Sequence, residues 1–414
     1  MNKINVVGIG LDGARGLTEQ VREVVSSATL LIGSDRHLSY FPSHPAQRST
    51  LGDFTQAINL IGSSVEECIV ILVTGDPLFF GLGRLLLLKL PSENLTFYPH
   101  LSAVQLAFSA IKVPWQDACF VSIHGRSSDQ LIQKMQQGKE KIAVLTDGVN
   151  TPRAIAQLFL SLDLPTNYKF WVCENLGGDN QQVSCFAASE LINQTFAPLN
   201  VVVLLRQETV TDLDIVKLPL FGISDRHYLG FSDRPGLMTK REIRILVLGE
   251  LALQPQQVVW DIGAGTGSVS IEIARLCPNS QVYAIEKTSV GYGLIAQNCR
   301  RFQVNNVVAI QGAAPEALAN LPNPDCIFIG GSGGNLTEIL KTCDRLSPQG
   351  VVVLALATVE HLTEALAWLG DRAWNYGLLQ VQLSRSVPVA HLTRFSPLNP
   401  VTIITATPAI KPRP

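Results

Sequence analysis

The sequence predicts an α/β protein of two domains, in which short buried strands alternate with helices. The chain has 414 residues, 46% of them hydrophobic, which is enough for two sizeable cores. Short apolar runs recur along it, and most end in a loop of Gly, Asp, Ser or Arg. One stretch, residues 258–287, has the pattern of a strand, a glycine-rich turn, a helix and a second strand.

The first half alternates predicted strands with helical segments. We expect strands at residues 4–10, 29–33, 69–74, 95–98, 119–123, 142–145, 169–173 and 200–205. Thr18 is suited to cap one helix, and Thr151 followed by Pro152 is suited to start another. Ligands of open α/β sheets gather where strands end, so the loops after these strands are candidates to line a cleft. Gly-Asp-Pro and Asp-Gly are also ordinary turn sequences.

A polar segment without periodicity, residues 207–218, predicts a domain boundary. We therefore expect domains at residues 1–206 and 222–414, joined by a linker at 207–221. Beyond the linker, an amphipathic pattern predicts a helix over residues 240–253. Thr239 is expected to cap this helix, with Glu242 completing a capping box.

The glycine-rich turn carries the clearest chemistry. Asp261 ends a buried apolar run and precedes the string Gly263-Ala264-Gly265-Thr266-Gly267. Glycines permit positive φ and let a ligand approach the bare backbone. Glu286 ends the second predicted strand about 20 residues later, where a carboxylate can accept hydrogen bonds from two ribose hydroxyls. A nucleoside-containing cofactor explains this pattern better than a purely structural turn.

Composition argues against several function classes. The formal net charge of −2 provides no basic surface for a nucleic acid. No apolar run reaches the ~18 residues of a membrane helix, and the N-terminal segment lacks the pattern of a signal peptide. Eight cysteines are scattered singly, without histidines at metal-ligand spacing. We expect buried reduced thiols, a cytoplasmic location, no membrane or nucleic-acid partner and no metal.

The second half resembles Rossmann-like S-adenosylmethionine methyltransferases, whose first motif is similar to the Asp261–Gly267 string. The nearby Gly236-Leu237-Met238-Thr239-Lys240, the segment 313–318 and the string after the fourth predicted strand, Gly330-Gly331-Ser332-Gly333-Gly334, resemble the decarboxylating C-15 methyltransferases of corrin biosynthesis. Ala313 stands where that family usually has aspartate. Segments at 351–356, 361–369 and 402–405 are consistent with completing a seven-stranded sheet.

The first half resembles the two-lobed tetrapyrrole methylase family. The motifs that carry this likeness are Val7-Gly8-Ile9-Gly10, Gly75-Asp76-Pro77, Ser102-Ala103-Val104-Gln105 and Thr146-Asp147. Four further strings resemble the branch that methylates C-5 of the corrin precursor: residues 34–38, 124–126, 150–152 and 174–178. His100 departs from the pattern, since much of the family has glycine there.

Together the two resemblances imply a bifunctional methyltransferase of cobalamin biosynthesis with one S-adenosylmethionine site in each domain. The N-terminal domain would methylate C-5 of precorrin-6B or its cobalt form. The C-terminal domain would methylate C-15 and decarboxylate the ring C acetate. A tetrapyrrole substrate and a homo-oligomer follow from the same likeness. The implied cofactor contacts are Thr239, Gly263, Ala264, Gly265, Thr266, Gly267, Glu286 and Ala314 in the second half, and Gly75, Asp76, Ser102 and Ala103 in the first.

Substrate carboxylates need cations, and proton transfer needs a titratable group. Arg234, Lys240 and His124 are the candidates for these catalytic roles. Further carboxylate-binding candidates are Arg36, Arg126 and Arg241, and His37 is a second proton carrier. Each is also compatible with an ordinary surface or loop role.

Three alternatives stay open at this point. The second half could methylate RNA or another small molecule, although the charge and the missing N-P-P-Y motif disfavour a nucleic-acid base. A nicotinamide oxidoreductase is disfavoured because Ser268 stands where a dinucleotide fingerprint has its third glycine. One half could instead be a non-catalytic cofactor sensor.

Overall fold

The computed structural model describes residues 3–52, 58, 60–61, 68–207, 213–234, 236–389 and 392–408. Contacts between Cα atoms divide the chain into two compact units. Unit 1 comprises Met1–Leu131, Glu140–Ala156 and Lys169–Leu205, and unit 2 comprises Ile132–Lys139, Gln157–Tyr168 and Arg206–Pro414. Residues 208–212 of the predicted linker lie outside the described residues.

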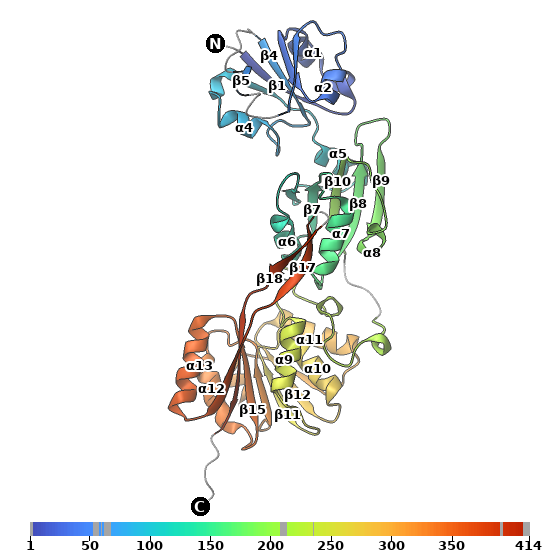
Figure 1. Ribbon diagram of the computed structural model, residues 1–414. Helices are drawn as coiled ribbons and strands as arrows, with labels where there is room; N and C mark the ends of the chain where they lie inside the picture. Colours follow the sequence, from blue (N-terminus) through green and yellow to red (C-terminus); the bar gives the residue numbers. More distant parts are fainter. Residues whose placement is uncertain are drawn as a thin grey trace, which may run out of the picture. The chain divides into compact units, whose positions relative to one another are not determined.

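Unit 1 begins with a five-stranded parallel sheet in the order β3-β2-β4-β1-β5 (Figure 1). Its strands are β1 (Lys3–Ile9), β2 (Leu30–Gly33), β3 (Gln47–Thr50), β4 (Cys68–Thr74) and β5 (Leu95–Tyr98). The helices with them are α1 (Glu19–Ser26), α2 (Asp35–Ser39) and α4 (Gly83–Leu87). Apolar side chains of β1, β2 and β4 point alternately into two cores, one on each face of the sheet.

A second, mixed sheet of unit 1 has the order β6-β7-β10-β8-β9. Its strands are β6 (Cys119–Ser122), β7 (Lys141–Leu145), β8 (Asn167–Glu174), β9 (Gln182–Ala187) and β10 (Asn200–Gln207). The accompanying helices are α5 (Ala103–Ile111), α6 (Asp129–Gln136), α7 (Pro152–Ser161) and α8 (Ala188–Leu191). Of these, α6 from Ile132 onward and α7 from Gln157 onward belong to unit 2. β7 pairs parallel with β6 and antiparallel with β10.

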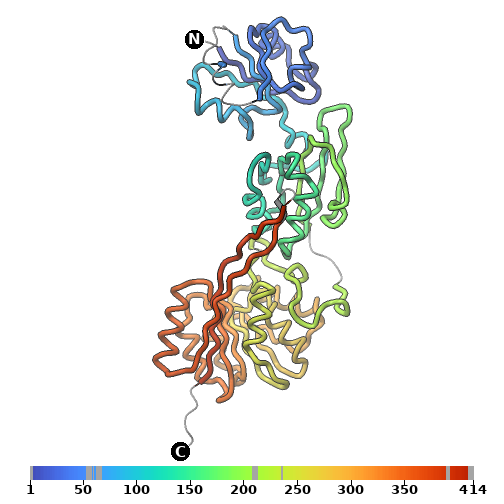
Figure 2. The backbone as a smooth tube through the Cα atoms, viewed as in Figure 1, coloured from blue at the N-terminus to red at the C-terminus, as the bar shows by residue number. Residues whose placement is uncertain are grey.

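Unit 2 is organised around a seven-stranded sheet in the order β13-β12-β11-β14-β15-β19-β16. The strands are β11 (Val258–Ile262), β12 (Gln281–Glu286), β13 (Val307–Gln311), β14 (Cys326–Ile329), β15 (Val351–Leu356), β16 (Asn375–Val381) and β19 (Val401–Thr407). The first five run parallel, while β19 pairs antiparallel with both neighbours. The hairpin of β17 (Ser384–Val389) and β18 (Leu392–Pro397) is inserted between β16 and β19 (Figure 2).

Helices cover both faces of this sheet (Figure 1). α9 (Arg241–Glu250), α10 (Ser268–Leu276) and α11 (Ser289–Arg301) lie on one face, and α12 (Leu336–Thr342) and α13 (Val359–Asp371) lie on the other. Two buried clusters fill the layers, one around Val247 and Ile273, the other around Leu340 and Trp368. The predicted Rossmann-like, seven-stranded fold of the second half is therefore confirmed, as is the α/β class of the whole chain.

Most predicted elements of the first half are present, and two helix starts are confirmed in detail. The Thr18 hydroxyl accepts a hydrogen bond from the Val21 N–H at 3.4 Å, and the Thr151 hydroxyl accepts one from Ala154 at 3.3 Å. The short strands β3 and β9, together with β16 and the β17–β18 hairpin, were not predicted. Their residues lack the apolar runs on which the strand predictions depended.

The predicted cap of α9 is wrong. Lys240, not Thr239, is the N-cap residue, and no side-chain oxygen caps the helix. Glu242 does not form a capping box, because its carboxylate accepts two hydrogen bonds from Arg385, at 3.0 and 2.8 Å. The expectation of buried thiols also needs correction, since all eight cysteines are free but Cys185 is exposed. No helix in the described ranges is long and apolar enough to cross a bilayer.

Candidate active site

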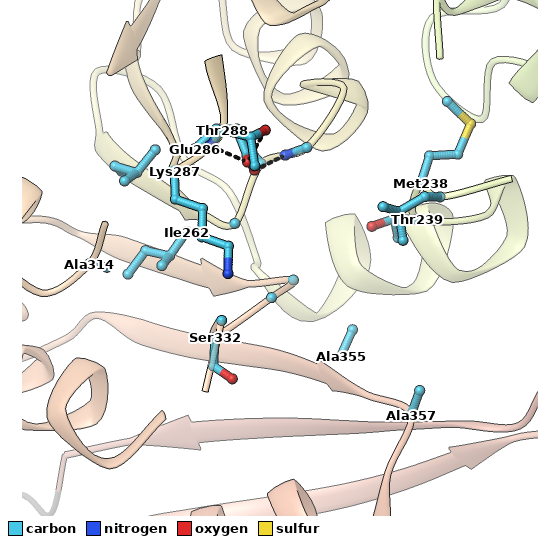
Figure 3. Close-up of a pocket in the computed structure, with 18 of the residues that line it drawn as sticks. Met238, Thr239, Ile262, Glu286, Lys287, Thr288, Ala314, Ser332, Ala355 and Ala357 are labelled. Carbon is cyan, nitrogen blue, oxygen red and sulfur yellow. Dashed lines mark hydrogen bonds between the residues drawn. The ribbon is translucent and has the colours of Figure 1, made fainter. Parts of the chain in front are cut away.

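A cavity of about 550 Å³ lies in unit 2, where β11, β12 and β14 end (Figure 3). This volume lies within the ~300–1,000 Å³ of small-molecule sites. Parallel strands bring their carboxyl ends to one edge of a sheet, so loops distant in sequence meet there. The wall includes the glycine turn after β11, Glu286–Thr288 after β12, residues 312–314 after β13, the glycine loop after β14 and the 236–240 segment before α9.

The three turn glycines have different roles. All three have positive φ: 73° at Gly263, 57° at Gly265 and 77° at Gly267. A Cβ on Gly263 would lie 2.3 Å from the carbonyl oxygen of Gly331, so this position requires glycine for packing between two loops. A Cβ on Gly265 would have no atom closer than 4.0 Å, which leaves its bare backbone open on the cavity side.

Glu286 is held rigidly at the end of β12. Its carboxylate accepts hydrogen bonds from the Gly265 N–H at 3.0 Å, the Thr288 N–H at 2.9 Å and the Thr288 hydroxyl at 2.8 Å (Figure 3). The residue is 8% exposed. A carboxylate has about four acceptor positions, so one is left for a ligand hydroxyl.

Beneath the turn lies a second, fully buried acid. One oxygen of Asp261 accepts hydrogen bonds from the Ser270 N–H at 3.1 Å and the Ser270 hydroxyl at 2.5 Å. The other oxygen has no partner within the described part of the chain, and the nearby Thr266 hydroxyl is likewise unpartnered. Burial raises the pKa of Asp261 to about 6, against the opposing effect of Ser270.

The 236–240 wall is anchored from behind by a buried ionic network. The Arg244 guanidinium donates to the Thr239 carbonyl at 2.6 Å, to Asp225 at 3.0 Å and to Glu272 at 2.7 Å. Glu272 also accepts from the Gly222 N–H at 2.6 Å and the Tyr228 hydroxyl at 3.1 Å. These side chains are at most 1% exposed, so the network ties the wall to α9 and α10. The sequence analysis did not predict it.

The predicted cations of the second half differ in position. Arg234 lines the cavity and pairs with Asp233 at 3.1 Å, with its guanidinium 5.7 Å from the Phe231 ring centroid. Lys240 also lines it and donates to the Gly236 carbonyl at 2.9 Å; burial lowers the pKa of this amine. Arg241 is not part of the cavity wall, because its side chain donates to the Gly222 carbonyl at 2.7 Å.

One cavity cation, Lys287, was missed. It directly follows Glu286 and extends across the cavity toward the segment that carries Ser332 (Figure 3). Its adjacency to the predicted ribose-binding acid was the available signal. Met238, Ser332 and Asn399 also line the cavity. Asn399 lies in the connection between β18 and β19, which no motif marked.

In unit 1, the predicted cofactor residues Gly75 and Ser102 lie side by side. A Cβ on Gly75 would be 3.2 Å from the Ser102 Cα, and a Cβ on Gly8 would be 1.9 Å from the Gly75 oxygen. Ser102 caps α5 in a complete capping box with Gln105. His100, the departure from the family pattern, donates its backbone N–H to the Gly75 carbonyl at 3.4 Å.

The other first-half candidates have local partners. The Asp76 carboxylate accepts from the Leu78 N–H at 2.8 Å, and Ala103 begins α5. His124 is exposed, with its Nδ1 3.0 Å from the Thr146 carbonyl oxygen. The guanidinium of Arg126 is 5.7 Å from the Phe80 ring centroid.

His37 is buried, unlike His124. Its Nε2 lies 3.1 Å from the Thr74 hydroxyl, which also accepts from Arg36 at 2.8 Å. Burial, with a further contribution from Arg36, lowers the pKa of His37 to about 4, so the ring is neutral at physiological pH.

The cavity thus brings together eight of the predicted second-half residues: Arg234, Thr239, Lys240, Gly263, Ala264, Gly265, Glu286 and Ala314. Two predicted contacts do not line it. Thr266 is 1% exposed, and Gly267 is the N-cap residue of α10. These two residues support the turn on the side that faces away from the cavity.

Comparisons with known proteins match both halves of the chain. A model of tetrapyrrole (corrin/porphyrin) methylases matches residues 3–191, and a model of the precorrin methyltransferase domain matches residues 231–408. A Sinorhizobium sp protein named precorrin-6Y C(5,15)-methyltransferase [decarboxylating] is 31% identical over 403 residues, which cover 96% of this chain and 95% of that protein.

Two further relatives match nearly the whole chain and one part of it, respectively. A Mycobacterium tuberculosis protein of the same name is 30% identical over 404 residues, covering 96% of this chain and 98% of the relative. The Salmonella typhimurium cobalt-precorrin-6B C(15)-methyltransferase (decarboxylating) is 38% identical over 169 residues, covering 40% of this chain and 87% of that protein.

Proposed function

The chain belongs to the family of decarboxylating precorrin-6Y C(5,15)-methyltransferases, and from this membership we propose two S-adenosylmethionine sites with divided labour. The enzyme methylates a precorrin at C-5 and C-15 and decarboxylates it in cobalamin biosynthesis. We assign C-15 methylation and decarboxylation of the ring C acetate to residues 222–414, and C-5 methylation to residues 1–206. The observation that carries the C-terminal assignment is the cavity that joins the glycine turn, Glu286 and Thr239.

The cavity residues fit the proposed cofactor. Glu286 has an acceptor position left for a ribose hydroxyl, and the open backbone at Gly265 allows close approach of a ligand. Ala314 would flank the adenine, where a small side chain leaves room for a planar ring. Ala313 offers no side-chain acceptor, so any hydrogen bond to an adenine edge must come from the backbone there.

When bound, S-adenosylmethionine supplies a methyl group already activated on a sulfonium. The protein therefore needs mainly to align the acceptor carbon and exclude water, and alignment alone can contribute about 7–11 kcal/mol. Thr239, Met238 and Ile262 lie on the wall that would orient the macrocycle against this methyl group. The half-buried Met238 and the buried Ile262 would help to exclude water from the reacting carbon.

Decarboxylation breaks the bond between the acetate methylene and its carboxyl carbon. The electron pair enters the conjugated macrocycle, carbon dioxide leaves, and a proton takes the vacated position. Arg234 and Lys240 would hold substrate carboxylates on the 236–240 side of the cavity. Burial of Lys240 strengthens such a contact, because less water competes for the ammonium.

For the second site, we propose that Gly75, Asp76, Ser102 and Ala103 hold the cofactor in unit 1. The support is local: Gly75 and Ser102 are adjacent, and Gly75 has a φ of 67° that favours glycine. His124 and Arg126 would face the substrate from the loop after β6. We also propose a cytoplasmic homo-oligomer that binds no nucleic acid or membrane; light scattering would measure the assembly.

The test uses the full chain, precorrin-6B and S-adenosylmethionine, with mass analysis of the macrocycle. Wild-type protein should add two methyl groups and lose one carbon dioxide. Glu286→Ala should abolish decarboxylation and the C-15 methyl, whereas Asp76→Ala should reduce only the C-5 methyl. Calorimetry with S-adenosylhomocysteine should give two equivalents per wild-type chain. One equivalent would support the alternative in which one half is a non-catalytic sensor.

A further inference from the structure

Lys287 is a cation of the C-terminal cavity for which the motifs provide no role. We propose that Lys287, together with the amides of the 332–334 loop, binds a carboxylate of the macrocycle that is retained during the reaction. This inference rests on the proposed function, because it assigns a substrate contact within the same cavity.

Lys287 lies between two segments of the cavity wall, the end of β12 and the loop that carries Ser332. The residue follows Glu286 at the end of β12, and its amino group points toward the segment that carries Ser332 (Figure 3). A Cβ on Gly333 would lie 3.0 Å from the Lys287 Nζ and 3.5 Å from its Cδ. The lysine therefore lies over bare backbone, and a side chain at residue 333 would displace its ammonium.

The ammonium is available for a ligand. Within the described part of the chain, no carboxylate or carbonyl pairs with Lys287, whereas Arg234 pairs with Asp233 and Lys240 donates to Gly236. The adjacent Glu286 carboxylate is bound by Gly265 and Thr288 instead. Lys287 is also exposed on the cavity side, so a ligand can reach it without displacing a protein partner.

The loop opposite Lys287 adds hydrogen-bond donors. Gly333 and Gly334 have φ of 60° and 97°, and in the described ranges the N–H groups of residues 332–334 donate to no protein acceptor. Ser332, Gly333 and Lys287 line the cavity. Their two amides and one ammonium match the chemistry of a carboxylate, which accepts several hydrogen bonds at once.

The reaction favours a retained carboxylate at this position. A cation bound to the departing group would stabilise the charged ground state against neutral carbon dioxide and slow decarboxylation. The macrocycle carries several carboxylates that survive. Lys240 belongs to the 236–240 wall, and Arg234 lines the cavity two residues before this segment. A contact from Lys287, which extends from the end of β12, would fix the ring from a second element of the sheet.

The test compares full-length Lys287→Gln, Lys287→Arg and the control Lys341→Gln, whose lysine is exposed and pairs with Glu338. Lys287→Gln should raise the KM for the macrocycle in C-15 methylation and decarboxylation roughly tenfold, as expected for one charged hydrogen bond. Its kcat should stay near the wild-type value, and Lys287→Arg should restore most of the KM. Lys341→Gln should leave both parameters unchanged.

Calorimetry with S-adenosylhomocysteine separates the substrate from the cofactor. Its Kd at the C-terminal site should change by less than about twofold in Lys287→Gln. A tenfold weaker Kd would assign the lysine to the cofactor's own carboxylate and overturn the proposal, as would an unchanged KM in an active enzyme. A wild-type chain that neither methylates at C-15 nor decarboxylates would instead refute the proposed function, and this inference with it.

Discussion

Replacing Arg244 by methionine tests the buried network behind the cavity wall. The guanidinium contacts Glu272 at 2.7 Å, Asp225 at 3.0 Å and the Thr239 carbonyl at 2.6 Å, and the side chain is fully buried. Removing one partner of a buried ion pair typically costs about 3–5 kcal/mol, because the remaining charge is left uncompensated. We expect a loss near 4 kcal/mol in unit 2, which is close to a thousandfold change in the folding equilibrium.

The loss should depend on pH. Burial raises the pKa of Asp225, so this carboxylate takes up a proton more readily once Arg244 is absent. The destabilisation should therefore be largest at neutral to alkaline pH and shrink as pH falls. Adding Glu272→Gln to Arg244→Met should recover part of the loss, since it removes the second uncompensated charge.

Hydrogen exchange measured by mass spectrometry on the full chain resolves the effect locally. Peptides from α9 and α10 report the opening free energy of the network directly. The control is Lys341→Met, which breaks the exposed pair with Glu338 and should cost no more than about 1 kcal/mol. If Arg244→Met cost no more than this control, the network would not anchor the wall. Weaker binding of S-adenosylhomocysteine at the C-terminal site should accompany the stability loss, because Thr239 loses its anchor.

Three further predictions concern single positions. Gly263→Ala should abolish cofactor binding at the C-terminal site in calorimetry and cost more than about 1–2 kcal/mol, because its Cβ would lie 2.3 Å from the Gly331 carbonyl oxygen in a left-handed conformation. The matched Gly249→Ala, at an exposed position of α9 with open space around it, should instead stabilise by up to about 1 kcal/mol. The pKa of Asp261 is raised to about 6 from 3.8, so the folded state loses roughly 3 kcal/mol of stability as pH rises through this window. Asp261→Asn should therefore raise Tm at about pH 8 and change it little near pH 4. A change in Tm that does not depend on pH would contradict the burial argument. The pKa of His37 is lowered to about 4 from 6.5, so the stability of the folded state falls as pH drops through that range. An NMR titration should find the His37 ring still neutral at about pH 5.5. A protonated ring at that pH would refute the buried placement.

Much of the fold was predictable because the conformation of a strand, helix or turn depends strongly on residues that are adjacent in the sequence. The alternation of apolar runs with polar loops located the central strands, and the glycine spacing with Glu286 located the glycine turn that lines the cavity. Short exposed strands such as β9 escaped prediction, since few of their side chains are buried and the apolar signal is weak. The cap of α9 was mispredicted because Glu242 pairs with Arg385, a residue 143 positions away, rather than with its own helix start.

The sequence by itself therefore determined the α/β class, the two family resemblances and the glycine–acid pattern of the C-terminal site. Only the tertiary structure decided which charged residues act together. Arg244 forms ion pairs with Asp225 and Glu272. Lys287 lies over Gly333, and the Arg241 side chain donates to the Gly222 carbonyl rather than lining the cavity. The physical reason is that φ preferences and apolar periodicity are properties of neighbouring residues, whereas ion pairs and cavity walls depend on which elements the sheet order brings together.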